Sequence, residues 1–184
     1  MTKSIKEFFK NLKVVLTLLC MIFLINISKS FTEEINSWGE LIRKGEIYYK
    51  KKGNVPYTGV LRNYFPTGEI SLINNFKDGK QHGSFKSFHR NGNLAMEGQF
   101  VDGKQHGFWS EYYDNGKLYW KLEYIKGIEA DGPFQMFHKN GQLKSEVVYS
   151  KGKPASNWIY YDEYGKKERM DIYEDGKFFY EKHF

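Results

Sequence analysis

The chain has almost no cysteine: Cys20 is the only one among its 184 residues. It lies inside an apolar N-terminal run, so the rest of the chain can form neither a disulfide nor a zinc site of the cysteine type. The folded part must therefore be held together by its own strand pairing and side-chain packing.

Long hydrophobic runs are scarce as well. The longest spans residues 14–27, which is short of the roughly 20 residues that a membrane-spanning helix needs. Lysines precede this run, and Ser28 and Ser30 stand three residues and one residue before a cut at Phe31. This order is typical of a secretory signal peptide, so we expect residues 1–30 to export the chain to the periplasm, the cell surface or the medium. The alternative is that residues 14–27 remain as an uncleaved membrane anchor.

The excess of positive charge is also small once this leader is set aside. The whole chain has a formal net charge of +6, with 28 basic and 22 acidic residues. Five of the basic residues and one acidic residue lie in residues 1–30, which leaves 23 basic and 21 acidic residues elsewhere. A nucleic-acid-binding domain needs a clustered basic face, so we expect no nucleic-acid partner.

What the sequence does have is glycine at a fixed spacing. Two sets of five glycines each repeat at intervals of 24, 24, 25 and 24 residues. The middle set is Gly68, Gly92, Gly116, Gly141 and Gly165, and the closing set is Gly79, Gly103, Gly127, Gly152 and Gly176. A period of this length indicates a repeat array, in which one supersecondary unit stacks on the next.

Each unit reads as two strands and two turns. In residues 83–106, the sequence predicts strands over 84–89 and 94–100, with turns at Asn91-Gly92 and Asp102-Gly103. Both dipeptides favour type I′ hairpin turns, which need positive φ at two successive residues. No helix-length segment separates the turns. We therefore predict an all-β fold, an elongated and twisted antiparallel meander of roughly ten strands. Five repeats of about 24 residues would fill residues 57–180, followed by a tail at 181–184.

Aromatic residues recur in register along the repeats. The first column is Leu61, Phe85, Trp109, Phe134 and Trp158, and the second is Tyr64, Phe88, Tyr112, Phe137 and Tyr161. We interpret both columns as packed ladders of the core, with an exposed binding stripe as the alternative. A spacing of three residues puts the two columns on opposite faces of a regular strand, unless a bulge redirects one of them.

Residues 31–56 lack the period, and we interpret them as a lead-in that caps the first unit. Thr32-Glu33-Glu34 predicts the start of a short helix that runs to about Arg43. A strand is expected over 46–49 and an extended segment over 54–59.

The repeated units carry a family resemblance. The segments YTGVLRNYFPTGEISLINNFKDGKQ and HGSFKSFHRNGNLAMEGQFVDGKQ, and the lead-in GEIYYKKKGNVPYTG, resemble the bacterial MORN-repeat-variant family over roughly residues 41–177. Members of that family are often described as the antitoxin component of a toxin–antitoxin pair. The resemblance implies an elongated antiparallel sheet and a binding role.

Few residues of the sequence indicate catalysis or metal binding. His82 and His106 recur in Gln-His-Gly, where a metal ladder is one reading and a turn position is the other, which we favour. The sequence contains no G-x-S-x-G nucleophile motif and no glycine-rich phosphate loop that leads into a helix. We therefore expect no enzymatic activity, no catalytic residues, no cofactor and no bound metal.

Two functions of different classes remain. The first is a non-catalytic exported repeat protein that binds a protein partner, with an antitoxin- or immunity-like role as its more specific form. The second is an envelope-associated protein that binds lipid headgroups or glycans through Trp109, Trp120 and Trp158. The sequence does not indicate an oligomeric state.

Cleavage of the leader can be tested directly. We expect the protein purified from its native host to begin at Phe31, because a signal peptidase cuts after small residues at the two preceding specificity positions. Mass spectrometry of the intact protein measures this. A full-length species found in the cytoplasm would contradict export.

Overall fold

Strand pairing dominates the computed structural model of the chain, which describes residues 33–184. The expected signal peptide, at residues 1–30, lies outside the described residues. Residues 34–184 make up one unit of the fold. No helix within the described residues is long and apolar enough to cross a bilayer.

The strands fall into a long sheet and a short hairpin. The long sheet has 14 strands, and its main path runs β1-β4-β5-β6-β7-β8-β9-β11-β12-β14-β15-β16. The bounds of these strands are β1 Glu33–Ile35, β4 Gly59–Tyr64, β5 Ile70–Lys77, β6 Lys80–Phe88, β7 Leu94–Val101, β8 Lys104–Tyr112, β9 Leu118–Ile125, β11 Gly132–Phe137, β12 Leu143–Ser150, β14 Trp158–Tyr161, β15 Lys167–Glu174 and β16 Lys177–His183. The two-residue strands β10 Ile128–Glu129 and β13 Lys153–Pro154 extend β9 and β12 as hairpins, and β2 Leu41–Lys44 pairs with β3 Ile47–Lys50.

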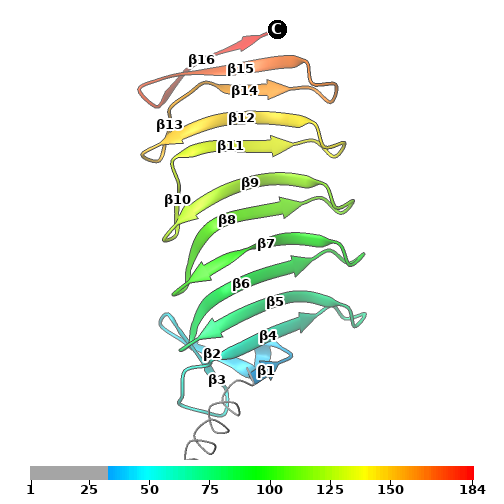
Figure 1. The fold of residues 1–184 in the computed structure, drawn as a ribbon, viewed down its shortest axis with the longest axis vertical. Coiled ribbons are helices and arrows are strands. Elements are labelled where there is room, and N and C mark those ends of the chain that lie inside the picture. The colour runs from blue at the N-terminus through cyan, green and yellow to red at the C-terminus, as the bar shows by residue number, and fades with distance from the viewer. Residues whose placement is uncertain (1–32) are drawn as a thin grey trace, which may run out of the picture. The chain divides into compact units, whose positions relative to one another are not determined.

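From β4 onward the strands follow one another in sequence order, each antiparallel to the last (Figure 1). This is the predicted all-β meander of repeated hairpins. The path from β4 to β16 holds eleven strands besides β10 and β13, close to the ten expected. Residues 181–183, expected as a tail, instead continue β16.

The closing glycines form the type I′ turns that the sequence predicts. At the turn between β7 and β8, Asp102 has φ 51° and Gly103 has φ 84°, and Val101 pairs with Lys104 across a two-residue loop. The Gly103 N–H also donates to the carbonyl of Gln81 at 2.8 Å, which ties the turn to the preceding unit. Gly79 and Gly127 make the same bond, to the carbonyls of Tyr57 and Gln105, so these three turns fix both the hairpin and its place beside its neighbour.

The middle glycines form a different turn, and the prediction of type I′ geometry is wrong for them. Gly92 has φ 84°, but Asn91 does not have a positive φ. The loop is instead a three-residue hairpin connection, in which Gly92 N–H donates to the His89 carbonyl at 2.9 Å and His89 N–H donates to the Asn93 carbonyl at 2.8 Å. The reason is the length of the loop, because the same two bonds recur at Phe65 and Gly68, where no asparagine precedes the glycine. At Asn91 the side chain adds support, since its Oδ1 accepts from the Asn93 N–H at 3.1 Å.

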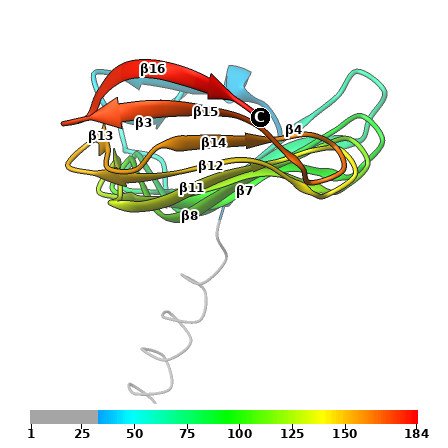
Figure 2. The ribbon, with the colours of Figure 1, turned by 90° about the horizontal axis from the view of Figure 1, so that it is seen from above.

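Two further glycines at the 24-residue spacing, Gly83 and Gly107, lie where the ladder is irregular. Gly83 has φ 91° and lies within β6 where the pairing with β5 shifts register between Asn74 and Phe76. A bulge of this kind bends a strand and increases its twist. Figure 2 shows the strands as curved ribbons that follow one another with a progressive rotation.

The lead-in is not helical, so the helix predicted from Thr32 to Arg43 is wrong. Its described residues form β1, a single 3-10 turn over Trp38–Glu40 and then β2. Ser37 caps only that turn, through an N–H bond from Gly39 to its Oγ at 3.0 Å. Strand pairing outweighs the helix propensity of this segment because Leu41 to Lys44 find hydrogen-bond partners in β3.

This lead-in covers the start of the sheet. Its residues join the first unit in one cluster of buried side chains: Ile35, Leu41, Tyr57, Leu61 and Phe76, with Trp38, Tyr48 and Leu72 packed against them. Rings meet at near-perpendicular angles, as where Tyr48 lies 5.3 Å from Phe76 at 69°. The first unit therefore has a second layer over one of its faces.

Tyr57 makes this cluster sensitive to alkaline pH. The side chain is 2% exposed and its hydroxyl donates to the Val60 carbonyl at 2.9 Å. Burial, followed by the negative charges of Glu34 and Glu40, raises the pKa of Tyr57 to about 12. The unfolded chain loses this proton near pH 10, so the stability that Tyr57 contributes is intact below pH 10 and is lost as pH rises toward 12.

We therefore expect the free energy of unfolding to fall by about 2 kcal/mol more in the parent than in Tyr57→Phe between pH 9 and pH 11.5. Urea titrations of both proteins at the two pH values measure the difference. Identical pH dependence in parent and variant would show that Tyr57 titrates normally in the folded state.

Candidate functional site

The first aromatic column lies along one face of the sheet, which we call the tryptophan face. Leu61 and Trp109 are buried there, at 0% and 2% exposure, while Phe85, Phe134 and Trp158 are half-buried. Phe100, from β7 of the preceding unit, shares this face, since its ring lies 4.9 Å from Trp109. Within the column, the ring of Phe85 lies 5.3 Å from Trp109, and the ring of Phe134 lies 6.1 Å from Trp158.

Trp109 occupies a space that only glycine leaves open. A Cβ at Gly98, on the neighbouring strand, would lie 2.3 Å from two atoms of the indole ring. The ring is also 5.3 Å from Phe85, and its Nε1 donates to the Gln99 carbonyl at 3.1 Å. Because Gly98 is neither a turn nor a bulge residue with positive φ, its role is to let the indole lie flat against the backbone.

The second column lies on the opposite face, so both faces carry aromatic residues. Tyr112 donates from its hydroxyl to Glu97 Oε1 at 2.9 Å, and Tyr161 donates in the same way to Glu146 Oε1 at 2.8 Å. Burial, and next the bond to the carboxylate, raises the pKa of both tyrosines. Tyr64 departs from the expected burial, because it is 39% exposed at the first unit.

Side chains at the loop ends link each unit to the next, which the sequence analysis missed. The Nε2 atoms of His89 and His138 donate to the carbonyls of Tyr112 and Tyr161 at 2.8 Å each. Tyr113, at the equivalent position, donates to the Phe137 carbonyl at 2.8 Å. The sequence does contain a sign of these links. His89, Tyr113 and His138 each directly follow a residue of the second aromatic column, so they occupy equivalent positions in successive repeats.

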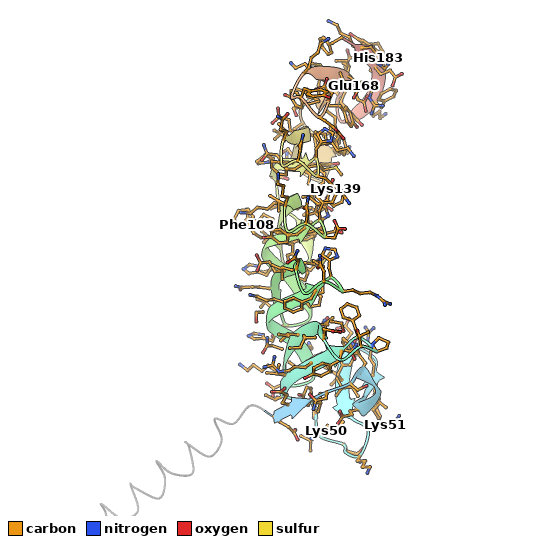
Figure 3. The ribbon with its side chains drawn as sticks, turned by 90° about the vertical axis from the view of Figure 1, so that its right-hand side faces the viewer. Lys50, Lys51, Phe108, Lys139, Glu168 and His183 are labelled. Carbon is orange, nitrogen blue, oxygen red and sulfur yellow. The ribbon has the colours of Figure 1, made fainter. Side chains whose placement is uncertain are left out.

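The loop asparagines make a second set of such links. Asn91, Asn115 and Asn140 each donate from Nδ2 to a backbone carbonyl in the next loop, at 2.6, 2.9 and 2.7 Å. Beside them, Lys139 bonds to Asp114 and holds the pKa of that carboxyl below its usual value. Figure 3 shows Lys139 at the loop side of the sheet. These links serve the geometry of the array and form no reactive cluster.

The histidines of the Gln-His-Gly sequences do not come together. His82 lies in β6, with its Nδ1 3.3 Å from Asp102 Oδ1, whereas His106 is exposed on β8. Across residues 33–184, no group of three or more His, Cys, Asp or Glu side chains could hold a metal ion.

Apolar side chains remain exposed on the face opposite the tryptophans. Phe108 is 57% exposed and Val148 is 43% exposed, and Figure 3 shows Phe108 projecting from one side of the sheet. A shallow hollow of about 370 Å³ lies on this face, lined in part by Pro133, Val148, Ile159 and Met170. These residues were not predicted as site residues, since the equivalent positions in other repeats are often polar or charged, as at Gln99 and Glu123 for Val148.

The comparisons with known proteins agree with this architecture. Three consecutive segments, residues 81–102, 105–126 and 130–151, match the model of the MORN repeat variant family. These matches coincide with the second, third and fourth hairpin units of the sheet. No curated protein matches the sequence.

Among solved structures, the chain is similar to a chain in the crystal structure of accessory secretory protein 1, 2 and 3 in Streptococcus pneumoniae, at 12% identity and a TM-score of 0.31. The alignment covers 81% of this chain and 24% of that chain, so this chain spans about a quarter of its length. A TM-score this low does not establish a common fold.

The tryptophan column gives a stability prediction. Trp109→Ala should lower the free energy of unfolding by about 3–5 kcal/mol, because the buried ring packs against Phe85 and Phe100 and fills the space above Gly98. Trp158→Ala should cost less, since Trp158 is only half-buried near the end of the array. Urea titrations of the two variants measure both values, and near-zero changes at both sites would show that the column is not a packed core.

Proposed function

We propose that this chain is a non-catalytic, exported repeat protein that binds a protein partner, with an antitoxin- or immunity-like role as the more specific form. The observation that carries the proposal is the exposed apolar surface opposite the tryptophan face. Phe108 is 57% exposed and Val148 is 43% exposed in the middle of the sheet, where a purely structural array would place polar residues.

The chemistry of this surface suits a protein better than a small molecule. The hollow beside Val148 is shallow and open, with Glu146, Ser156 and Asn157 among the residues that line it. Phe108 lies under the ammonium group of Lys121, at 4.1 Å from Nζ to the ring centroid. Aromatic and aliphatic anchors inside a polar surround are the usual composition of a protein interface.

The rest of the unit supplies a rigid support. Backbone pairing runs without interruption from β4 to β16, and side chains such as His89 and Asn115 bond to the next loop. Because the partner-facing residues lie on paired strands, little conformational entropy is lost when they bind. A one-layer array of this kind works as a scaffold that displays side chains along its length.

The more specific role follows from the family resemblance and from the predicted leader. Relatives with this type of repeat are often described as antitoxins, and an exported chain would meet its toxic partner outside the cytoplasm. An immunity-like protein would then neutralise the toxin by covering its surface. Co-expression with the product of the adjacent reading frame, followed by growth assays, tests this form of the proposal.

Binding of lipids or glycans through the tryptophans has weaker support. Trp109 is 2% exposed and Trp158 is half-buried, so neither indole offers a free face to a ligand. Trp120 is half-buried as well, and its Nε1 is bonded to Glu111. Stacking on sugars or insertion at a headgroup needs exposed aromatic rings, which these residues do not provide.

The proposal is tested by affinity capture of the tagged full chain from its native host after cross-linking. We expect one protein to co-purify in stoichiometric amount, and the double variant Phe108→Ser with Val148→Ser to reduce its recovery at least about tenfold, because anchors at the centre of an interface dominate its free energy.

Val55→Ser is the matched control, since Val55 is 77% exposed in the lead-in loop and lies away from this surface. It should leave the recovery unchanged. Liposomes and a glycan array are screened in parallel. Binding to either of these, without any protein recovered, would contradict the proposal.

A further inference from the structure

The last strand of the sheet, β16, is exposed along its whole length. Within the described residues, it pairs on one side with β15 and has no strand on its other side. All seven of its residues are exposed, and its aromatic side chains are unusually open, with Phe178 at 57%, Phe179 at 62% and Tyr180 at 49%. An edge strand with this composition is a template for pairing with another polypeptide.

The backbone groups that face outward can be assigned. Phe184 N–H donates to the Glu168 carbonyl at 3.1 Å, on the side of β15. In an antiparallel ladder the bonded residues alternate, so Tyr180 and Lys182 also direct their backbone groups toward β15. The N–H and C=O groups of Glu181 and His183 therefore point away from the sheet and are available to an incoming strand.

The side chains of β16 determine which side chains an incoming strand should have. Tyr180 lies opposite Ile172 and Lys182 lies opposite Met170, which places both on the face that bears Val148 and Ile159. Along this face the edge presents an aromatic ring, a lysine and then the ring of Phe184, which is 5.0 Å from Lys182 Nζ. An acidic residue beside Lys182, flanked two positions away on each side by apolar residues, complements this order.

A second copy of the chain complements the edge less well. β16 carries Lys177 and Lys182 against the single acidic residue Glu181, so two such edges would bring like net charges together. The register shift between Ile172 and Tyr173 also bends the edge, which discourages flat pairing of two copies. The positive charge that disfavours self-pairing is the charge that selects an acidic strand.

We propose that β16 accepts, as an added strand, an extended acidic and apolar segment of the protein partner. This inference rests on the proposed function and adds a main-chain docking site to it. Backbone bonds to Glu181 and His183 would supply affinity, and the side chains of Tyr180, Lys182 and Phe184 would supply specificity.

The experiment uses a fluorescently labelled, capped peptide of sequence Thr-Val-Thr-Glu-Thr-Val-Thr, titrated with the full chain and followed by anisotropy. We expect saturable binding, and binding about tenfold weaker when the central Glu of the peptide is replaced by Lys. Lys182→Glu should reverse this preference, because Lys182 is the charge that faces the central position.

Two substitutions at Glu181 separate the contribution of its backbone N–H to peptide binding from the contribution of its side chain. Glu181→Pro removes an outward N–H while leaving the bonds to β15, so it should weaken peptide binding at least about tenfold. Glu181→Ala keeps that N–H and removes the only acid of the edge, so it should tighten binding. Circular dichroism of both variants checks that the sheet is intact.

The outcomes also distinguish this inference from the proposed function. Peptide binding that is equal for both Glu181 variants overturns the edge site, and so does a dimer in sedimentation that Glu181→Pro dissolves. Partner capture that persists in Glu181→Pro, with no binding of the peptide, overturns the edge site and leaves the proposed function standing. Peptide binding without any captured protein supports the edge site and contradicts the proposed function.

Discussion

The structure depends on a single register, the one in which each strand pairs with the next. Two kinds of turn set it. The two-residue turns at the closing glycines need positive φ at both positions, as at Asp102 and Gly103, and the loops at the middle glycines need it at one. A slip of one residue would move every side chain to the other face, so the aromatic columns, the loop-end bonds and the exposed surface would all be lost together.

Given that register, a one-layer sheet can bury a core only between neighbouring strands and units. Trp109 shows how: its ring lies over Gly98 and against both Phe85 and Phe100, and it needs no second layer to reach 2% exposure. The lead-in around Leu41 adds a layer to the first unit. Each unit therefore adds its own contribution to the stability of the array. The face opposite the tryptophans is not needed for this packing, so its side chains can vary.

The meander and its period could be read from the sequence because glycine spacing reports turns directly. The aromatic columns could be located for the same reason, since a fixed repeat places equivalent residues side by side. The turn type at Asn91 could not be predicted, because it depends on whether two or three residues form the loop, and the Asn93 N–H that donates to Asn91 Oδ1 supports the longer loop. The helix expected near Thr32 failed because propensity is weak beside the pairing of β2 with β3.

The candidate interaction surface was harder to predict than the fold. Phe108 stands where another unit has Ser84, so it breaks the period and gives no columnar signal. The role of Gly98 was equally hidden, because it becomes visible only when Trp109 is placed against it. A periodic pattern identifies the residues that the repeats share. The proposed partner surface is made of residues that differ from one repeat to the next, so the pattern does not identify it.

The central claim is that the tryptophan face holds the fold together while the opposite face and the β16 edge bind a partner. Hydrogen–deuterium exchange of the full chain, alone and with the captured protein, tests it most directly. The account predicts slow exchange around Trp109 in both states, with new protection on binding confined to β8 through β16, which hold Phe108, Val148 and the edge strand, and greatest at Glu181 and His183. Protection limited to β4 through β7, or rapid exchange around Trp109 in the free chain, would contradict it.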